Sequence, residues 1–196
     1  KTLFEQQYYA YDRAVSPEKH SSIKKEVVST GSNKVKKKYT LRWKISPRET
    51  LTTNSGTTYI KQKSGTFYDL LPKGLHLEKG SIDVVTDQGS LDKNSYSYKV
   101  TQDYRNSGRD MVKITIPVAA DFYDVYLNSE ISWDAIKDYG DAVINPVAYE
   151  TGNDDITDGF NDNGGNLSQS NKDYMTGLDS KSNTKRFLYD ESKHNI

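Results

Sequence analysis

The chain has 196 residues and carries 27 basic and 27 acidic side chains, so its formal net charge is zero. A neutral chain has no global field that would attract nucleic acid or a membrane surface, and we expect neither as a partner. Cysteine is absent, which excludes disulfides, thiolate metal sites, thioesters and a cysteine nucleophile.

The charges are unevenly distributed along the chain. Basic residues crowd the first quarter, whereas the stretch from Asp121 to Asp162 holds eleven acidic residues and one basic residue, Lys137. Two explanations stay open: solvated faces of strands that neighbour each other in the fold, or a patch that steers a charged ligand. No apolar run reaches membrane-spanning length, and the chain starts at Lys1 without a signal peptide. We expect an excised piece of a longer, secreted protein.

The clearest strand signal lies at residues 35–46. Apolar side chains alternate with polar ones there, which indicates a half-buried strand of a sandwich. The apolar positions are Tyr39, Leu41, Trp43 and Ile45. A shorter strand is predicted at 23–28 and is expected to end in a turn at 29–33.

Other short strands follow at intervals of about ten residues. They are predicted at 57–62, 66–71, 80–85, 96–102, 111–118, 123–133 and 142–150. Residues 47–56 are expected to form a polar loop, and a helix over 132–139 is the alternative to strand there. Many short strands separated by turn signals predict an all-β fold, an immunoglobulin-like β-sandwich with long loops.

The composition divides the chain into three predicted regions. Residues 1–20 are a lead-in segment or linker, residues 21–150 the β-sandwich, and residues 151–196 an acidic Gly/Asn-rich loop with a terminal strand or the start of the next module. The loop offers carboxylates that could bind calcium, although their spacing does not match the EF-hand and a solvated loop is the alternative. These residues are Asp154, Asp155, Asp158 and Asp162. No other cofactor is predicted.

One predicted strand, at 66–71, carries an acid among apolar residues. At period 2, Asp69 shares a face with Phe67 and Leu71, and burying an ionisable group costs free energy unless it is paired or has a role. Lys25 and Asn145 occupy the same kind of position on two other predicted strands, each flanked two residues away by apolar side chains. The alternation therefore predicts three polar side chains on inward faces.

Buried together, these three side chains could react. Burial lowers the pKa of a lysine and raises the pKa of an aspartic acid, which would give a neutral amine at Lys25 and a proton donor at Asp69. The amine would attack the side-chain carbonyl of Asn145, and Asp69 would pass a proton to the departing ammonia. The pattern suggests a self-formed Lys–Asn amide cross-link. An ordinary Lys25–Asp69 ion pair, or a wrong assignment of the faces, is the alternative.

Three stretches carry a resemblance to a known family: YTLRWKIS, FYDLLPKGLHLEKGS and VINPVAYETGN. Their order resembles the repeated domains of Gram-positive surface adhesins and fimbrial proteins, including antigen I/II C-terminal domains and collagen-binding-type adhesin domains. Several members carry a self-generated isopeptide bond between a first-strand lysine and a last-strand asparagine, assisted by an aspartate. By position, the resemblance implies Lys25, Asn145 and Asp69 for these roles. Lys24 adjoins Lys25 and could replace it, and Pro146 departs from the pattern because it lacks a ladder donor.

The resemblance implies a structural or adhesive domain of a bacterial cell-wall-anchored surface protein, located outside the cell. Its partners would be a host protein or glycan ligand, or neighbouring domains of the same surface protein. It would not be an enzyme, beyond a single-turnover cross-link. The alternative is a carbohydrate-binding module of an extracellular hydrolase. A buried lysine–aspartate–asparagine set favours the first function, whereas exposed coplanar aromatic side chains around one groove favour the second.

Overall fold

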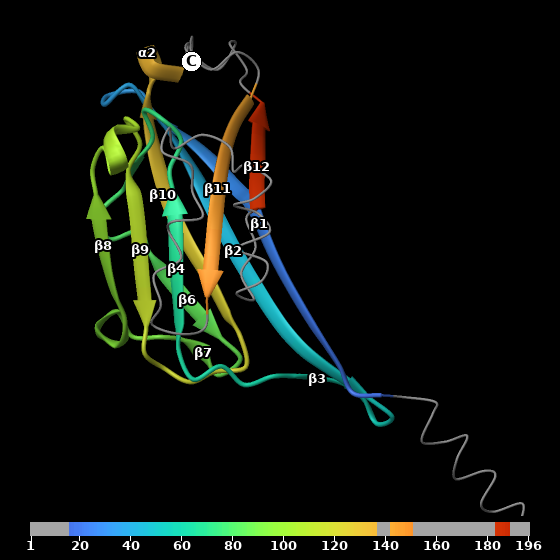
Figure 1. Ribbon diagram of the computed structural model, residues 1–196. Helices are drawn as coiled ribbons and strands as arrows, with labels where there is room; N and C mark the ends of the chain where they lie inside the picture. The colour runs from blue at the N-terminus through green and yellow to red at the C-terminus, as the bar shows by residue number, and fades with distance from the viewer. Residues whose placement is uncertain (1–15, 137–141, 151–182, 189–196) are drawn as a thin grey trace, which may run out of the picture.

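The computed structural model describes residues 16–136, 142–150 and 183–188. In this part of the chain, two antiparallel β-sheets lie face to face and form a sandwich (Figure 1). The predicted all-β, immunoglobulin-like β-sandwich is confirmed. The helical elements are short: η1 (Lys93–Ser95), η2 (Tyr104–Asn106) and α2 (Trp133–Ile136).

The larger sheet has seven strands in the order β1-β2-β10-β6-β7, with β3 added beside β2 and β5 beside β10. Its strands are β1 (Glu18–Asn33), β2 (Lys38–Thr53), β3 (Gly56–Tyr59), β5 (His76–Leu77), β6 (Asp83–Thr86), β7 (Gly89–Ser90) and β10 (Tyr123–Ser132). The smaller sheet has five strands in the order β12-β11-β4-β9-β8. Its strands are β4 (Gly65–Leu70), β8 (Ser97–Thr101), β9 (Met111–Ile116), β11 (Ala142–Glu150) and β12 (Asn183–Leu188).

The core lies between the two sheets and follows the predicted alternation. On β2 the predicted inward side chains are buried, and the residues between them are partly exposed. They are Tyr39, Leu41, Trp43 and Ile45. Residues of the smaller sheet join the same cluster, among them Phe67, Val112 and Ile114. β4 is the middle strand of that sheet and is buried at all six positions, which places Asp69 in the interior.

The first two strands are longer than the local pattern indicates. β1 continues through the predicted turn at 29–33, and β2 continues through most of the predicted loop at 47–56. The chain reverses instead at 34–37. β1 accommodates an extra residue in a bulge between Val27 and Ser29. These predictions were wrong because pairing with a neighbouring strand satisfies the backbone of polar residues that have little strand preference of their own.

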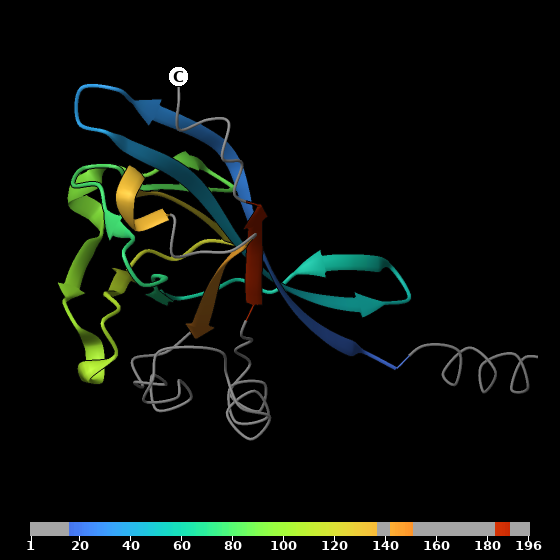
Figure 2. The ribbon, with the colours of Figure 1, turned by 90° about the horizontal axis from the view of Figure 1, so that it is seen from above.

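The far ends of β1 and β2 leave the sandwich and, together with β3, form a ribbon that projects from one end (Figures 1 and 2). Within this ribbon, Glu18 lies opposite Thr52, and Thr53 lies opposite Gly56. β3 is exposed at all four positions. The ribbon therefore adds solvent-exposed surface to the molecule and contributes little to the hydrophobic core.

The predicted Pro-Lys-Gly turn follows β4. The amide of Leu75 donates to the carbonyl of Pro72 at 3.0 Å, and Gly74 has a φ of +84°. Glycine adopts a positive φ at the third position of a turn without steric cost. Towards the end of the described sandwich, α2 forms within the stretch for which a helix was the alternative to strand.

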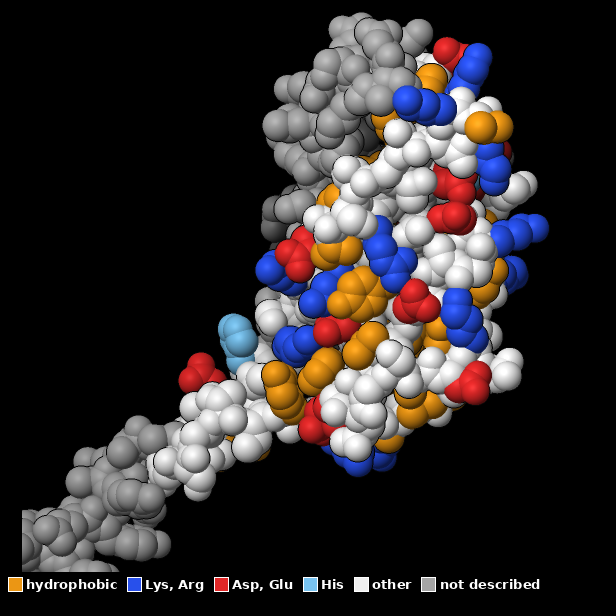
Figure 3. Space-filling view, turned by 180° about the vertical axis from the view of Figure 1, so that it is seen from behind, with side chains coloured by type: hydrophobic (Ala, Val, Ile, Leu, Met, Phe, Trp, Pro, Cys, Tyr) orange, Lys and Arg blue, Asp and Glu red, His pale blue; other side chains and the backbone are white. Residues whose placement is uncertain are grey.

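The outer face of the larger sheet carries interspersed charges of both signs (Figure 3). Basic residues of β2 meet acidic residues of the neighbouring β10. The nitrogen–oxygen distance is 3.5 Å for Lys38 and Glu130 and 2.8 Å for Arg48 and Asp124. For these two pairs, basic and acidic residues that lie far apart along the chain meet on neighbouring strands.

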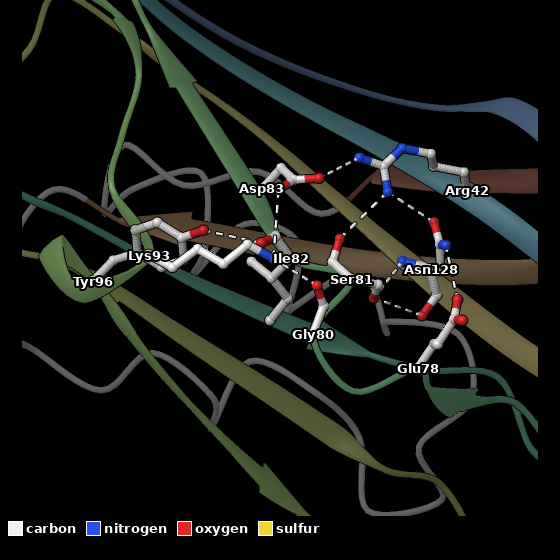
Figure 4. A network of polar contacts seen from close by, with 9 residues as sticks. All are labelled: Arg42, Glu78, Gly80, Ser81, Ile82, Asp83, Lys93, Tyr96 and Asn128. Atoms are coloured by element: carbon white, nitrogen blue, oxygen red, sulfur yellow. Dashed lines mark hydrogen bonds and ion pairs between the residues drawn. The ribbon is translucent and has the colours of Figure 1, made fainter.

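Arg42 is the centre of a polar network on this face (Figure 4). Its Nη2 atom lies 2.7 Å from Oδ2 of Asp83, and Nη1 donates to Oδ1 of Asn128 at 2.8 Å and to the carbonyl of Ser81 at 3.3 Å. Asn128 in turn donates to the Glu78 carboxylate at 2.8 Å. One guanidinium therefore connects β2, β10, β6 and the segment that precedes β6.

Two further predictions concern the calcium ligands and the division of the chain into regions. The predicted calcium ligands Asp154, Asp155, Asp158 and Asp162 lie outside the described residues. β12 pairs with β11 antiparallel, from Val147 opposite Asn183 to Ala142 opposite Leu188. The division of the chain at residues 20 and 150 stays a prediction.

No helix in the described part of the chain is long and apolar enough to cross a membrane.

Candidate functional site

A lysine and an aspartate meet in the interior of the sandwich. The Nζ atom of Lys25 donates to Oδ1 of Asp69 at 2.8 Å, and neither side chain is exposed to solvent. The two residues are 44 positions apart in the chain, and they come from opposite sheets. Two of the three residues that the alternation placed on inward faces are thus in direct contact.

Alternation along β1 decides which lysine enters the core. Ile23 and Val27 pack against the core on the same face as Lys25. The neighbouring Lys24 points outward, with 72% of its side chain exposed, and pairs with Glu26 at 3.3 Å. Of the two adjacent lysines, Lys25 is therefore the buried one.

An aromatic ring holds the lysine from a third strand. The Lys25 ammonium lies 5.0 Å from the ring centroid of Trp43, a distance at which the negative face of the ring attracts a cation. The indole Nε1 of Trp43 donates to the hydroxyl of Ser129 at 2.9 Å. Trp43 is buried and its one polar group is hydrogen-bonded, so its ring is held in one position against Lys25.

A second buried cation lies at the end of β4. Arg109, which is 8% exposed, donates from Nε to the carbonyl of Leu71 at 2.8 Å and from Nη2 to the carbonyl of Leu70 at 3.1 Å. The backbone of the same loop is also attached to β4, since the amide of Leu71 donates to the carbonyl of Asp110 at 2.8 Å. These bonds hold the two residues that directly follow Asp69.

Burial lowers the pKa of Lys25 from 10.5 to about 8. Loss of hydration is the largest cause, because the charged form is disfavoured away from water. The Asp69 carboxylate opposes the shift through its charge and its hydrogen bond, and the positive charge of Arg109 adds to it. An amine with a pKa near 8 is partly neutral at physiological pH and can act as a nucleophile.

The strand that carries Asn145 lies directly beside Asp69. β11 pairs with β4 antiparallel, with Val147 opposite Asp69 and Glu150 opposite Thr66. Residue 145 is two positions from Val147, so it lies on the same face of the sheet as residue 69. Diagonal neighbours of this kind are about 7–8 Å apart between Cα atoms. The backbone register therefore places residue 145 two positions before the residue that lies opposite Asp69, and its membership of the site stays a prediction.

Pro146 does not interrupt the ladder between β11 and β4. The pairs of these two strands begin at Val147, and Pro146 lies opposite Thr184 of β12. A missing backbone donor at Pro146 is thus no loss for β4. The departure from the family pattern is compatible with this register.

Arg109 is not among the residues that the sequence predicts for this site. It follows a stretch with turn signals, and a single arginine beside Asp110 reads as an exposed ion pair of a loop. Ser107 and Gly108, directly before Arg109, allow the loop to turn back and are the sequence signal that could have indicated a buried arginine. Gly108 has a φ of +73°. Only the folded loop shows that Arg109 is buried against the end of β4.

Comparison with solved structures gives neighbours that include pilins and an adhesin domain. The major pilin SpaA of Corynebacterium diphtheriae, whose structure is described as pointing to stabilising isopeptide bonds, aligns with a TM-score of 0.44 and 11% identity over 71% of this chain and 32% of the pilin. The pilus backbone protein RrgB of Streptococcus pneumoniae has a TM-score of 0.41 and 12% identity over 69% of this chain and 32% of its own.

The collagen-binding domain of a Staphylococcus aureus adhesin aligns with a TM-score of 0.41 and 14% identity, over 76% of this chain and 88% of the domain. These neighbours are pilins and adhesins of Gram-positive bacteria. The chain spans about a third of the length of the two pilins. No family model matches the sequence, and no curated protein matches it.

Exposed aromatic side chains in the described residues do not form one platform. Tyr59 lies on β3 of the larger sheet and Tyr98 on β8 of the smaller sheet. The ring of Phe122 lies 5.5 Å from that of Tyr59 between centroids and is tilted by 55° from it, and the guanidinium of Arg48 lies 4.0 Å from the Phe122 centroid. The described residues also contain no group of three or more histidine or carboxylate side chains placed to hold a metal ion.

Proposed function

We propose that this chain is a structural or adhesive domain of a Gram-positive cell-wall-anchored surface protein, stabilised by a self-formed isopeptide bond between Lys25 and Asn145. The observation that carries the proposal is the buried contact between Lys25 and Asp69 beside the strand that holds Asn145. An ion pair is a poor way to stabilise a core, because desolvation offsets most of its attraction and apolar residues of similar size often serve better. A chemical role explains why such a pair is buried.

The reaction would use each group of the site once. Lys25 first passes a proton to Asp69, which leaves a neutral amine and a protonated carboxyl group. The amine attacks Cγ of Asn145 while the carboxyl group hydrogen-bonds and polarises the carbonyl oxygen. The Nζ–Cγ bond forms, the Cγ–Nδ2 bond breaks, and Asp69 returns its proton so that ammonia leaves as ammonium. The lysine ammonium and the primary amide thereby become a secondary amide and ammonium, with the total charge unchanged.

Folding supplies the proximity that this reaction needs. β1 belongs to the larger sheet and β11 to the smaller one, so Lys25 reaches residue 145 only after the two sheets have packed. Holding the reacting groups in place replaces an encounter in solution, which can account for about 7–11 kcal/mol of a reaction barrier. The bond would join the two sheets covalently through the core.

A covalent bond between the sheets suits a domain that bears load or is exposed to proteases. Such a domain would lie outside the cell, either as a stalk between neighbouring domains of the same surface protein or as a carrier of a site for a host protein or glycan. The reaction would occur once per molecule, so the domain would turn over no external substrate.

Intact mass spectrometry of the folded chain tests the proposal. We expect the wild type to be one ammonia lighter than its sequence mass, and Lys25→Met and Asn145→Ala to have their full masses. Lys24→Met is the matched control, since it removes an exposed lysine next to the site and should still lose ammonia. Fragmentation should place the link between the peptides that contain residues 25 and 145. A folded wild type with its full sequence mass would contradict the proposal.

A further inference from the structure

Two buried cations lie near Asp69, one in contact with its carboxylate and one attached to the two residues that follow it, and the cross-link consumes only the first. Lys25 and Asp69 have no exposed side-chain surface, and Arg109 is buried beside the end of β4. Asp69 and Arg109 are the two charged groups whose fields shift the pKa of Lys25. Before any reaction the site therefore holds two positive charges and one negative charge.

We propose that Arg109 is a positioning residue of the cross-linking site: it is the counter-ion that Asp69 keeps after Lys25 has reacted. This inference rests on the proposed function, because it concerns the charge left by the isopeptide reaction. It assigns a role to a residue that lies outside the lysine, aspartate and asparagine set.

The charge balance of the reaction supports this role. The positive charge of Lys25 leaves the site as ammonium, and the amide that replaces it is neutral. Asp69 has returned its proton and is again a carboxylate in the interior. A lone buried carboxylate is strongly disfavoured, whereas a buried carboxylate beside a guanidinium that cannot lose its proton is tolerated. With Arg109 present, the reaction turns a site of net charge +1 into a neutral one.

The contacts of Arg109 suit a fixed counter-ion. Its Nε and Nη2 atoms hold the carbonyls of Leu71 and Leu70, the two residues after Asp69, so the guanidinium is attached to the strand that carries the acid. The planar group presents several donors in a rigid arrangement, and two of them are already used for this attachment. A lysine at this position would keep the charge and lose the double attachment.

Arg109 also acts on the amine before the reaction. Its charge disfavours the protonated form of Lys25. Without it, a smaller fraction of Lys25 would be neutral at a given pH. Removing the charge should therefore slow cross-linking and shift its pH dependence to higher pH, whereas loss of packing alone would slow it equally at every pH.

The test compares wild type, Arg109→Met and Arg109→Lys, each prepared in denaturant before cross-linking and then refolded at a series of pH values. The loss of ammonia is followed by intact mass over time. At neutral pH we expect Arg109→Met to react more slowly than the wild type, because a smaller fraction of Lys25 is then the neutral amine. Its rate profile should move to higher pH, and Arg109→Lys should restore the wild-type profile. Arg42→Met, which removes a guanidinium from the outer face, should leave the profile unchanged.

A second measurement needs no variant. In the cross-linked wild type, the carboxyl carbon of Asp69 observed by NMR should report an ionised group throughout the neutral pH range. A protonated Asp69 at neutral pH, or identical rate profiles for wild type and Arg109→Met, would overturn the inference while a light wild-type mass still supported the cross-link. A wild type that never loses ammonia would overturn both.

Discussion

The Nζ atom of Lys25 lies 2.8 Å from Oδ1 of Asp69, and the strands that carry these atoms belong to opposite sheets of the sandwich. This contact is a buried polar connection between the two sheets. Because β11 lies beside Asp69, a bond from Lys25 to that strand would turn the contact into a covalent connection between the sheets.

Replacing Asp69 by alanine should block the cross-link and lower the stability of the domain. A bond from Lys25 to Asn145 encloses about 120 residues, and the loop-entropy model used for disulfides gives it a contribution on the order of 5 kcal/mol as an upper figure. We expect Asp69→Ala to fold with its full mass, to melt at a markedly lower temperature and to extend under a pulling force that the wild type resists.

A second variant separates loss of the bond from loss of the aspartate. Asn145→Ala keeps the Lys25–Asp69 pair and lacks only the acceptor, so it should also melt below the wild type. If both variants melt and extend like the wild type although neither has the bond, the cross-link is not what strengthens this domain.

The stability of Asn145→Ala should rise between about pH 8 and pH 10.5. Lys25 stays an amine in this variant, and burial lowers its pKa to about 8, whereas the unfolded chain titrates at the ordinary 10.5. Within this window the unfolded chain binds a proton that the folded chain has lost, so the free energy of unfolding increases with pH, by up to about 3 kcal/mol. Below pH 8 both states are protonated and this lysine adds no slope.

Chemical denaturation at a series of pH values measures this rise. The double variant Asn145→Ala with Lys25→Met carries the same tyrosines and lacks the amine, so the difference between the two curves isolates Lys25. Parallel curves through this window would show that the buried lysine has an ordinary pKa.

Arg42→Met should destabilise the larger sheet by about 1–2 kcal/mol, because Asp83 and Asn128 lose a charged hydrogen-bond donor. Lys24→Met removes an ion pair that is mostly exposed and should change the stability by less than about 0.5 kcal/mol. Urea unfolding midpoints of both variants, with the cross-link intact, give the comparison. Equal effects would mean that the network of Figure 4 contributes no more than a surface ion pair.

Gly74→Ala should cost about 1–2 kcal/mol, since an alanine must adopt the positive φ of +84° that this turn requires. Gly31→Ala is the matched control. It lies within β1, and a Cβ there would meet no atom within 4 Å. We expect it to be neutral or slightly stabilising, because alanine restricts the unfolded chain. Thermal melting of both variants checks the difference, and a turn that tolerates alanine as well as the strand does would contradict it.

If Asp154, Asp155, Asp158 and Asp162 bind calcium, a chelator should lower the melting temperature and added calcium should restore it. A variant with all four replaced by asparagine should respond to neither. Identical melting curves for the wild type with and without chelator would indicate that these residues form a solvated loop and do not bind calcium.

Local patterns in the sequence determined much of the sandwich. The alternation from Tyr39 to Ile45 predicts an inward face that is buried, and the Pro-Lys-Gly stretch predicts the turn at Gly74. Both signals are local, because side chains of a strand alternate between its faces and a positive φ selects glycine. The same alternation predicted that Lys25 and Asp69 enter the core.

Only the tertiary structure decided how far the strands extend and which groups meet. β1 and β2 lengthen each other through backbone pairing, which depends on a partner strand rather than on the residues themselves. The choice of Lys25 over Lys24 follows from the face that β1 turns to the core. The attachment of Arg109 to the carbonyls of Leu70 and Leu71 follows from a loop that folds back onto the end of β4, and no periodic pattern predicts such a contact. The pKa of an ionisable side chain is shifted by burial and by neighbouring charges, and both depend on how distant strands pack together.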